Sequence, residues 1–158
     1  TPIGFWEYLG DHIGVGTQPF AGFKMLARDK IYMYLVIQRS TGQTTFYLEN
    51  ITHPDVASQV TVLNVADYYD GSTAEWIDER LSYVNIATGA SSPTSLIDFG
   101  TTSWSNMKAE LLSGAYSNAG AETAHGMYMV NSQSQILAKP NGGLDTSTTF
   151  TDNFWKCQ

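Results

Sequence analysis

The chain has 158 residues, of which 42% are hydrophobic and 13% aromatic, so it is long enough to bury a core and too apolar to be disordered. Its net charge of −7 argues against nucleic acid as a partner, and no apolar run approaches the roughly 20 residues of a membrane helix. Only 15% of the residues are charged, against about 25% in an average domain. Such a surface suits acid conditions, because few salt bridges are lost when carboxylates become protonated.

Short segments in which apolar and polar residues alternate recur along the whole chain, separated by clusters of Gly, Asn, Asp, Ser and Thr. This pattern predicts an all-β fold, an antiparallel β-sandwich of the concanavalin or jelly-roll kind, formed as a single domain over residues 1–158. The clearest strand is 30–38, which a turn at 39–42 joins to a returning strand at 44–51. Further strands are expected at 1–9, 21–27, 58–65, 95–104, 127–130, 135–138 and 147–155, loops at 87–93 and 117–122, and one short helix at 107–112.

Residues 68–81 carry the pattern with the most chemical content, Tyr-Tyr-Asp-Gly-Ser-Thr-Ala-Glu-Trp-Ile-Asp-Glu-Arg-Leu. Asp70-Gly71 favours a tight turn, and the residues after it are typical of a strand. Alternate residues of a strand share a face, so Glu75 and Glu79 would point the same way. Two carboxylates on one face either face water or line a cleft, and alternation alone leaves both interpretations open.

The run from Gly71 to Glu79 resembles the signature of the glutamic peptidases (eqolisins), which are acid endopeptidases built as β-sandwiches. The resemblance implies that Glu79 is the catalytic glutamate and that Glu75 flanks it. Further similar stretches follow the family's order, at residues 28–31, 46–52, 98–100 and 129–132.

Phe5-Trp6-Glu7-Tyr8 is similar to the family's Trp-Tyr-Glu-aromatic strand. This likeness implies that Glu7 borders the active site. Phe5 and Trp6 are then candidate walls of a cleft that accepts an extended peptide.

The family pairs its glutamate with a glutamine in an N-terminal Gln-x-Gly strand, and this chain begins at about the Trp-Tyr-Glu strand. We therefore expect it to cover about the C-terminal two-thirds to three-quarters of a family domain. Neither Gln18 nor Gln59 lies in the glutamine motif. Three explanations stay open: a short N-terminal chain of the same precursor as a partner, loss of that segment in handling, or a homologue without the glutamine. Missing strands would expose sheet edges, which favours the partner chain.

The resemblance implies peptide hydrolysis at about pH 2–4, with the glutamate as general base and the glutamine amide stabilising the oxyanion. Its substrate would be a polypeptide, and neither a cofactor nor a metal is expected, since the three histidines have no metal-ligand spacing. Two alternatives remain. One is a carbohydrate-binding or glycoside-cleaving β-sandwich, because paired carboxylates also suit glycosidases. The other is a non-catalytic homologue.

The remaining signals concern processing and location. The first residue is Thr1 rather than methionine, which suggests a processed start, and we expect a secreted, extracellular protein without a membrane partner. Cys157 is the only cysteine, so it cannot form a disulfide within the chain. Asn50-Ile51-Thr52 matches the N-glycosylation pattern.

Overall fold

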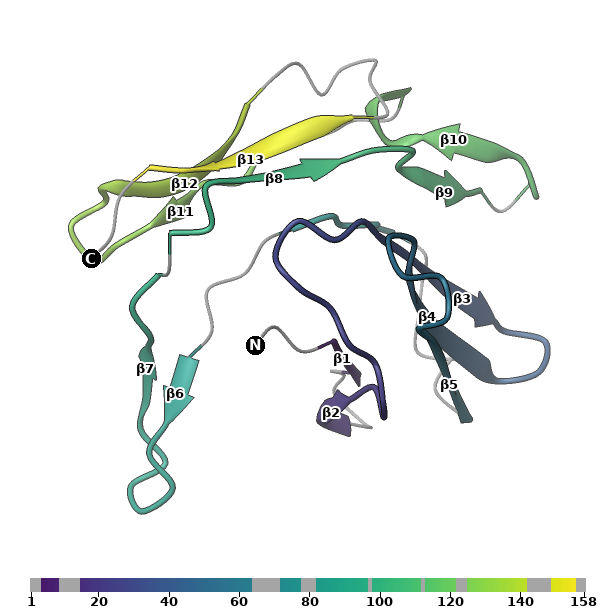
Figure 1. The fold of residues 1–158 in the computed structure, drawn as a ribbon, viewed down its shortest axis with the longest axis horizontal. Coiled ribbons are helices and arrows are strands. Elements are labelled where there is room, and N and C mark those ends of the chain that lie inside the picture. The colour runs from purple at the N-terminus through teal and green to yellow at the C-terminus, as the bar shows by residue number, and fades with distance from the viewer. Residues whose placement is uncertain are drawn as a thin grey trace. The chain divides into compact units, whose positions relative to one another are not determined.

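A computed structural model describes residues 4–8, 15–63, 72–77, 82–96, 98–111, 113–121, 125–141 and 149–155. All strand pairs formed by these residues are antiparallel (Figure 1), which confirms the predicted all-β, antiparallel fold class. No helix in this part of the chain is both long and apolar enough to cross a membrane. The strands are β1 (Phe5–Tyr8), β2 (Val15–Pro19), β3 (Ile31–Gln38), β4 (Gln43–Asn50), β5 (Ala57–Leu63), β6 (Ser82–Val84), β7 (Ser91–Pro93), β8 (Thr101–Trp104), β9 (Lys108–Glu110), β10 (Tyr116–Asn118), β11 (Met129–Val130), β12 (Ile136–Asn141) and β13 (Phe150–Phe154), with a 3-10 helix η2 at Ala119–Ala121.

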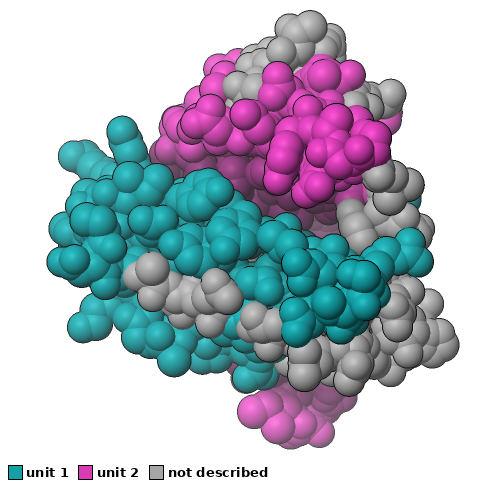
Figure 2. Space-filling view, turned by 90° about the vertical axis from the view of Figure 1, so that its right-hand side faces the viewer, with its two compact units in different colours: residues 1–72 teal, residues 73–158 magenta. Residues whose placement is uncertain are grey.

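The chain divides into two compact units, residues 1–72 and 73–158 (Figure 2). The first unit contains the hairpin β1–β2 and a three-stranded sheet in the order β3-β4-β5. The second contains the hairpins β6–β7 and β9–β10 and a four-stranded sheet in the order β11-β12-β13-β8. Each unit is described by itself, and a single sandwich domain over the whole chain stays a prediction.

The first unit is built on the hairpin that the sequence predicts most clearly. β3 and β4 pair without a break from Ile31 opposite Asn50 to Gln38 opposite Gln43. The turn between them ends at Gly42, whose φ of 69° is one that glycine adopts without strain. The predicted strands 30–38 and 44–51 are therefore confirmed to within one residue at each end.

β1 lies close to β4 because a glycine precedes it. A Cβ atom on Gly4 would lie 2.7 Å from Leu48 Cδ1 and 2.9 Å from Phe23 Cδ1, so only glycine fits without displacing its neighbours. Two residues later the Trp6 ring stacks on Phe46 of β4, with 5.2 Å between ring centroids. Phe20 and Phe23 are buried in the loop between β2 and β3.

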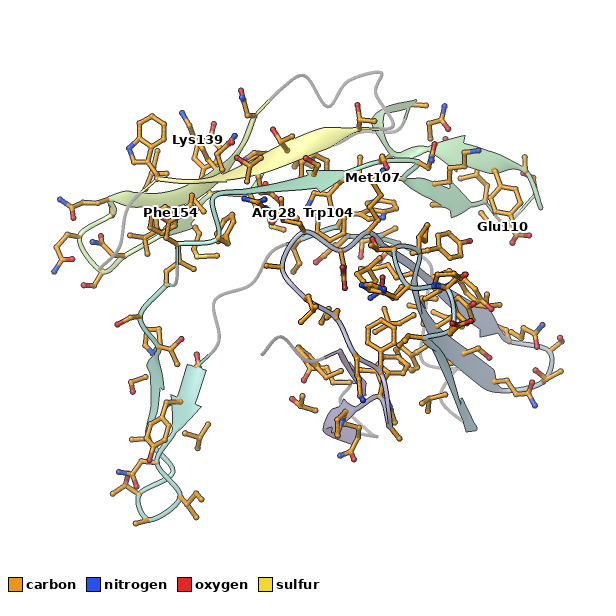
Figure 3. The ribbon with its side chains drawn as sticks, in the orientation of Figure 1. Arg28, Trp104, Met107, Glu110, Lys139 and Phe154 are labelled. Atoms are coloured by element: carbon orange, nitrogen blue, oxygen red, sulfur yellow. The ribbon has the colours of Figure 1, made fainter. Side chains whose placement is uncertain are left out.

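The second unit has its core on the four-stranded sheet. Leu96, Leu137 and Ala138 are buried together, and Phe99, Met129 and Phe154 pack against them. On the same sheet the Trp104 ring stacks on Phe150, and its Nε1 donates a 3.0 Å hydrogen bond to Asp152 Oδ2. Figure 3 marks Trp104 on β8 and Phe154 at the end of β13.

Several short elements differ from the sequence-based expectations. The helix expected at 107–112 is wrong, because Lys108–Glu110 form β9 and pair with β10. The loops expected at 87–93 and 117–122 are also wrong in part, since they contain β7 and residues of β10 and η2. These strands have three residues each, too few for a period-two pattern, so the partner strand rather than local propensity decides them.

Two expected strands are broken by turns. Residues 21–27 form a loop rather than a strand, with Gly22 at a φ of 75°. The strand expected at 95–104 begins only at Thr101, after Gly100 at a φ of 67°. A positive φ interrupts the ladder of a regular strand, which accounts for both corrections.

Candidate active site

Glu7 lies on β1 at an irregularity in the pairing with β2. The register shifts between Trp6, which is opposite Gln18, and Tyr8, which is opposite Val15. Glu7 is half-buried there, and its Oε2 accepts a 3.0 Å hydrogen bond from Thr17 Oγ1. Bulges of this kind re-aim side chains and occur often beside active sites. Thr17 therefore fixes the orientation of the Glu7 carboxylate.

Phe5 and Trp6 point to opposite faces of β1, as neighbouring strand residues do. Trp6 is half-buried and stacks on Phe46, so its ring is part of the packing between β1 and β4. Phe5 is 41% exposed and lies two residues before Glu7 on β1. Of the two candidate cleft residues, Phe5 is thus the one whose ring is exposed.

The segment around Glu75 belongs to the second unit, and residues 72–77 have no regular secondary structure. The strand expected over these residues is therefore wrong. None of them pairs with a strand that the structure describes, and extended residues need a partner to form a ladder. Trp76 is half-buried, and the other five residues of this segment, Glu75 and Ile77 among them, are exposed. Glu79, the predicted catalytic residue, lies outside the described residues.

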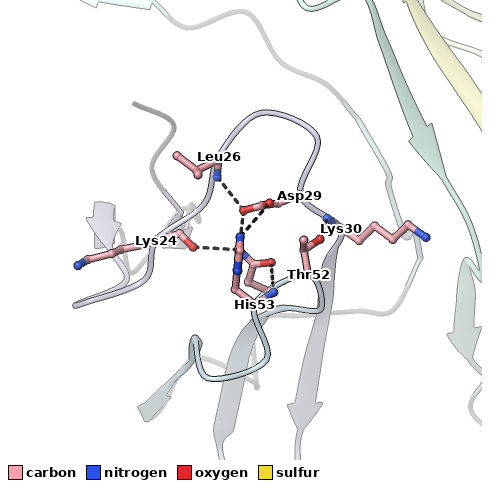
Figure 4. A network of polar contacts seen from close by, with 7 residues as sticks. Lys24, Leu26, Asp29, Lys30, Thr52 and His53 are labelled. Atoms are coloured by element: carbon pink, nitrogen blue, oxygen red, sulfur yellow. Dashed lines mark hydrogen bonds and ion pairs between the residues drawn. The ribbon is translucent and has the colours of Figure 1, made fainter.

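A network of polar contacts fastens the loop before β3 to the end of β4 (Figure 4). At its centre is Asn50, which is only 1% exposed. Its Nδ2 donates to Asp29 Oδ2 at 2.7 Å and to the Lys24 carbonyl at 3.2 Å, and its Oδ1 accepts from the His53 backbone N–H at 3.1 Å. The amide of Asn50 is therefore buried and fully engaged, which argues against glycosylation of the folded chain at this match to the acceptor pattern.

Asp29 is the charged member of this network. Its Oδ2 also accepts a 2.8 Å hydrogen bond from the Leu26 N–H, and its Oδ1 lies 3.6 Å from His53 Nε2. The pKa of Asp29 is lowered below 3.8. The hydrogen bond from the Leu26 N–H has the largest effect, the Asn50 amide and the His53 charge add to it, and desolvation opposes it. The carboxylate thus stays ionised further into acid than an ordinary aspartate. Sequence reasoning missed this network, although Asn50, Pro54 and Asp55 are residue types that favour turns.

Within the part of the chain that the structure describes, no group of three or more His, Cys, Asp or Glu side chains could hold a metal ion. Of the candidate carboxylates that the structure describes, Glu7 belongs to the first unit and Glu75 to the second.

Comparison with known families gives one finding. The model of the Peptidase A4 family matches residues 4–151, a range that takes in Glu7, Glu75 and Glu79. Comparison with curated proteins and with solved structures gives no match.

Proposed function

The chain belongs to the Peptidase A4 family, the glutamic peptidases, and from this premise we propose that it is an endopeptidase that cleaves polypeptides in acid. The observation that carries the proposal is the extent of the family match, which runs through both units and includes the Ala74-Glu75-Trp76-Ile77-Asp78-Glu79 run. We assign Glu79 as the catalytic residue and Glu7 and Glu75 as supporting carboxylates.

The proposed reaction begins when the carboxylate of Glu79 takes a proton from water as the water oxygen attacks the peptide carbonyl carbon. A glutamine amide donates a hydrogen bond to the oxyanion that forms. The C–N bond then breaks, and the proton held by Glu79 goes to the leaving amine. A carboxylate base has to be ionised while it works, so activity is expected at about pH 2–4, near the ordinary glutamate pKa of about 4.3.

The bond from Thr17 to Glu7 supports a positioning role for this second carboxylate. It holds one carboxylate oxygen, Oε2, and so restricts the rotation of the Glu7 side chain. We therefore expect Thr17→Val to impair substrate binding more than turnover. KM should rise while kcat changes little, whereas loss of the general base would lower kcat.

The glutamine that completes the reaction is proposed to come from an N-terminal segment, a short chain of the same precursor. A denaturing intact-mass spectrum of the native material tests this. A second peptide carrying a Gln-x-Gly strand beside the 17.4 kDa chain would support the two-chain enzyme. The 17.4 kDa species alone, in material that is active, would mean that this chain supplies the oxyanion donor itself.

The proposed function is tested by the activity of Glu79→Gln on a denatured protein substrate. Removing the general base should lower kcat by about a hundredfold or more, since general-base catalysis contributes about 10²–10⁴-fold. Glu110→Gln is the matched control, because Glu110 is an exposed strand glutamate on β9 and should keep wild-type activity. Unchanged activity in Glu79→Gln would refute the assignment. Binding of polysaccharides without any peptidase activity would favour the carbohydrate-binding alternative.

A further inference from the structure

β6 and β7 form a two-stranded sheet of their own in the second unit (Figure 1). Ser82 lies opposite Pro93 and Val84 opposite Ser91, and neither strand pairs with any further strand that the structure describes. All residues from 82 to 95 are exposed. An isolated two-stranded hairpin is at best marginally stable in water and needs a third strand or a packing face. Among the described residues, this hairpin has neither.

A well-bonded turn holds the two strands together. The Asn85 N–H donates to the Ala90 carbonyl at 2.9 Å, and the Gly89 N–H donates to the Asn85 carbonyl at 2.7 Å. Asn85 Oδ1 accepts bonds from the Ala87 and Thr88 N–H groups at 3.0 and 3.3 Å. Gly89 has a φ of 68°, which glycine adopts without strain. The turn therefore sets the geometry of the hairpin before any third strand is added.

The bond from the Asn85 N–H to β7 also fixes which backbone groups point outward. Backbone groups alternate between the two sides of an antiparallel strand. Val84 and Ser82 therefore direct their N–H and C=O groups to the open edge of β6. On the open edge of β7 the corresponding residues are Ser91 and Pro93, and proline has no N–H to donate. β6 is thus the edge that is better suited to pairing.

The composition of the hairpin indicates what kind of partner this edge suits. Residues 82–95 contain no Asp, Glu, Lys or Arg, so no charge protects the edge. Tyr83, Val84 and Ile86 are exposed, but most of their neighbours are Ser, Thr and Ala. Permanent interfaces are more hydrophobic than this. Main-chain hydrogen bonds would supply most of the affinity, as in other cases of strand addition. A strand of three residues offers few of them, so the edge suits a partner that binds and then leaves.

The position of β6 in the chain indicates which partner this is. β6 begins three residues after Glu79, the proposed catalytic residue. Three residues span at most about 11 Å, and an extended substrate covers the same distance with about three of its own residues. A polypeptide whose scissile bond lies at Glu79 therefore has residues within reach of β6.

We propose that β6 pairs with the polypeptide substrate, which adds a third strand to the hairpin next to the scissile bond. This inference rests on the proposed peptidase function. The Ser82 and Val84 N–H groups donate to substrate carbonyls, and their C=O groups accept from substrate N–H groups. Alternate side chains of the bound segment lie beside Tyr83 and Val84, which favours apolar residues there. The preferred substrate is thus an unfolded, extended polypeptide without proline in the paired segment.

Amide hydrogen exchange of labelled Glu79→Gln, with unfolded casein as the probe, tests the pairing. This variant lacks the proposed general base, so the casein stays intact. The Val84 N–H should become protected by about tenfold or more when casein is added, whereas the Ser91 N–H on the opposite edge should not change. Unchanged exchange at Val84 in saturating casein, or protection of Ser91 in its place, would overturn the proposal. Protection of Val84 before casein is added would also overturn it, because a second copy or another segment would then occupy the edge.

Two proline variants test the same pairing in turnover. Val84→Pro removes an outward N–H of β6 and should raise KM for casein by about three- to tenfold while kcat changes little. Ser91→Pro is the matched control, because it removes an outward N–H of β7 and should leave KM unchanged. Far-UV circular dichroism checks that both variants are folded. Equal kinetic constants in the two variants would overturn the pairing, although the peptidase function would stand. A wild-type chain without peptidase activity would instead refute the proposed function, and the exchange at Val84 would still decide whether polypeptides bind at β6.

Discussion

Replacing Asn50 with alanine tests whether the polar network of Figure 4 holds the loop before β3 to the sheet. The substitution removes three hydrogen bonds, to Asp29, to the Lys24 carbonyl and from the His53 N–H. Asn50 is 1% exposed and its three hydrogen bonds are partly buried, so water replaces them only in part. A typical intramolecular hydrogen bond contributes about 1 kcal/mol net, and a buried group left unsatisfied costs about 1–3 kcal/mol.

We therefore expect Asn50→Ala to lower the free energy of unfolding by about 3 kcal/mol. For a protein of this size, each kcal/mol shifts Tm by about 2–4 °C, so Tm should fall by about 6–12 °C. Urea denaturation monitored by tryptophan fluorescence measures the free energy, and calorimetry measures Tm. An unchanged m value would show that the denatured state is the same in both proteins.

Asn131→Ala is the matched control. The Oδ1 of Asn131 accepts bonds from the Gln133 and Gln135 N–H groups at 3.0 and 2.9 Å, but these bonds are exposed, so water can replace the side chain. Its cost should stay below about 1 kcal/mol. Asn50→Asp adds a second test. It sets a carboxyl group beside Asp29, so it should destabilise at neutral pH and recover as the pH falls. An Asn50→Ala variant as stable as Asn131→Ala would refute the anchoring role.

Three further predictions concern the same fold. The pKa of Asp29 is lower in the folded chain than 3.8, so the ionised carboxylate stabilises the fold above that pH, and this contribution is lost as the pH falls through the folded value. In urea at pH 6, Asp29→Asn should therefore be less stable than the wild type, and the difference should close toward strong acid. Leu137→Ala, at a side chain that is 0% exposed, should cost about 2–5 kcal/mol in the same assay. Gly4→Ala should cost about 1–3 kcal/mol by crowding Leu48, whereas Gly16→Ala, with nothing within 4 Å of the new Cβ, should cost less than about 1 kcal/mol. Equal costs for the two glycine variants would contradict the close approach of β1 to β4.

The long strands could be predicted from the sequence because their own residues determine them. β3 is a run of β-branched, aliphatic and aromatic residues, β4 carries Thr-Thr-Phe-Tyr-Leu, and a Gly-containing turn separates the two strands. The three-residue strands β7, β9 and β10 could not be predicted. Each is defined by hydrogen bonds to a partner strand, and so short a segment carries no period of its own.

As with the fold, the parts of the candidate site that depend on local sequence could be predicted, and the contacts between distant residues could not. The strand that carries Glu7 follows from local pattern, and the family follows from the run that ends at Glu79. The bond from Thr17 to Glu7 depends on how β2 returns along β1, which no local pattern specifies. The contact between Asp29 and Asn50 likewise joins residues 21 positions apart. Such contacts are set by tertiary packing, so only the structure reveals them.

The most direct test of the central claim is the dependence of kcat/KM on pH for the wild-type protein and for Glu79→Gln, measured on a fluorogenic peptide. A glutamate general base predicts activity that is greatest at about pH 2–4 and that is lost in Glu79→Gln across the whole range. A wild-type protein with its greatest activity at neutral pH, or an acid activity that Glu79→Gln retains in full, would contradict the account.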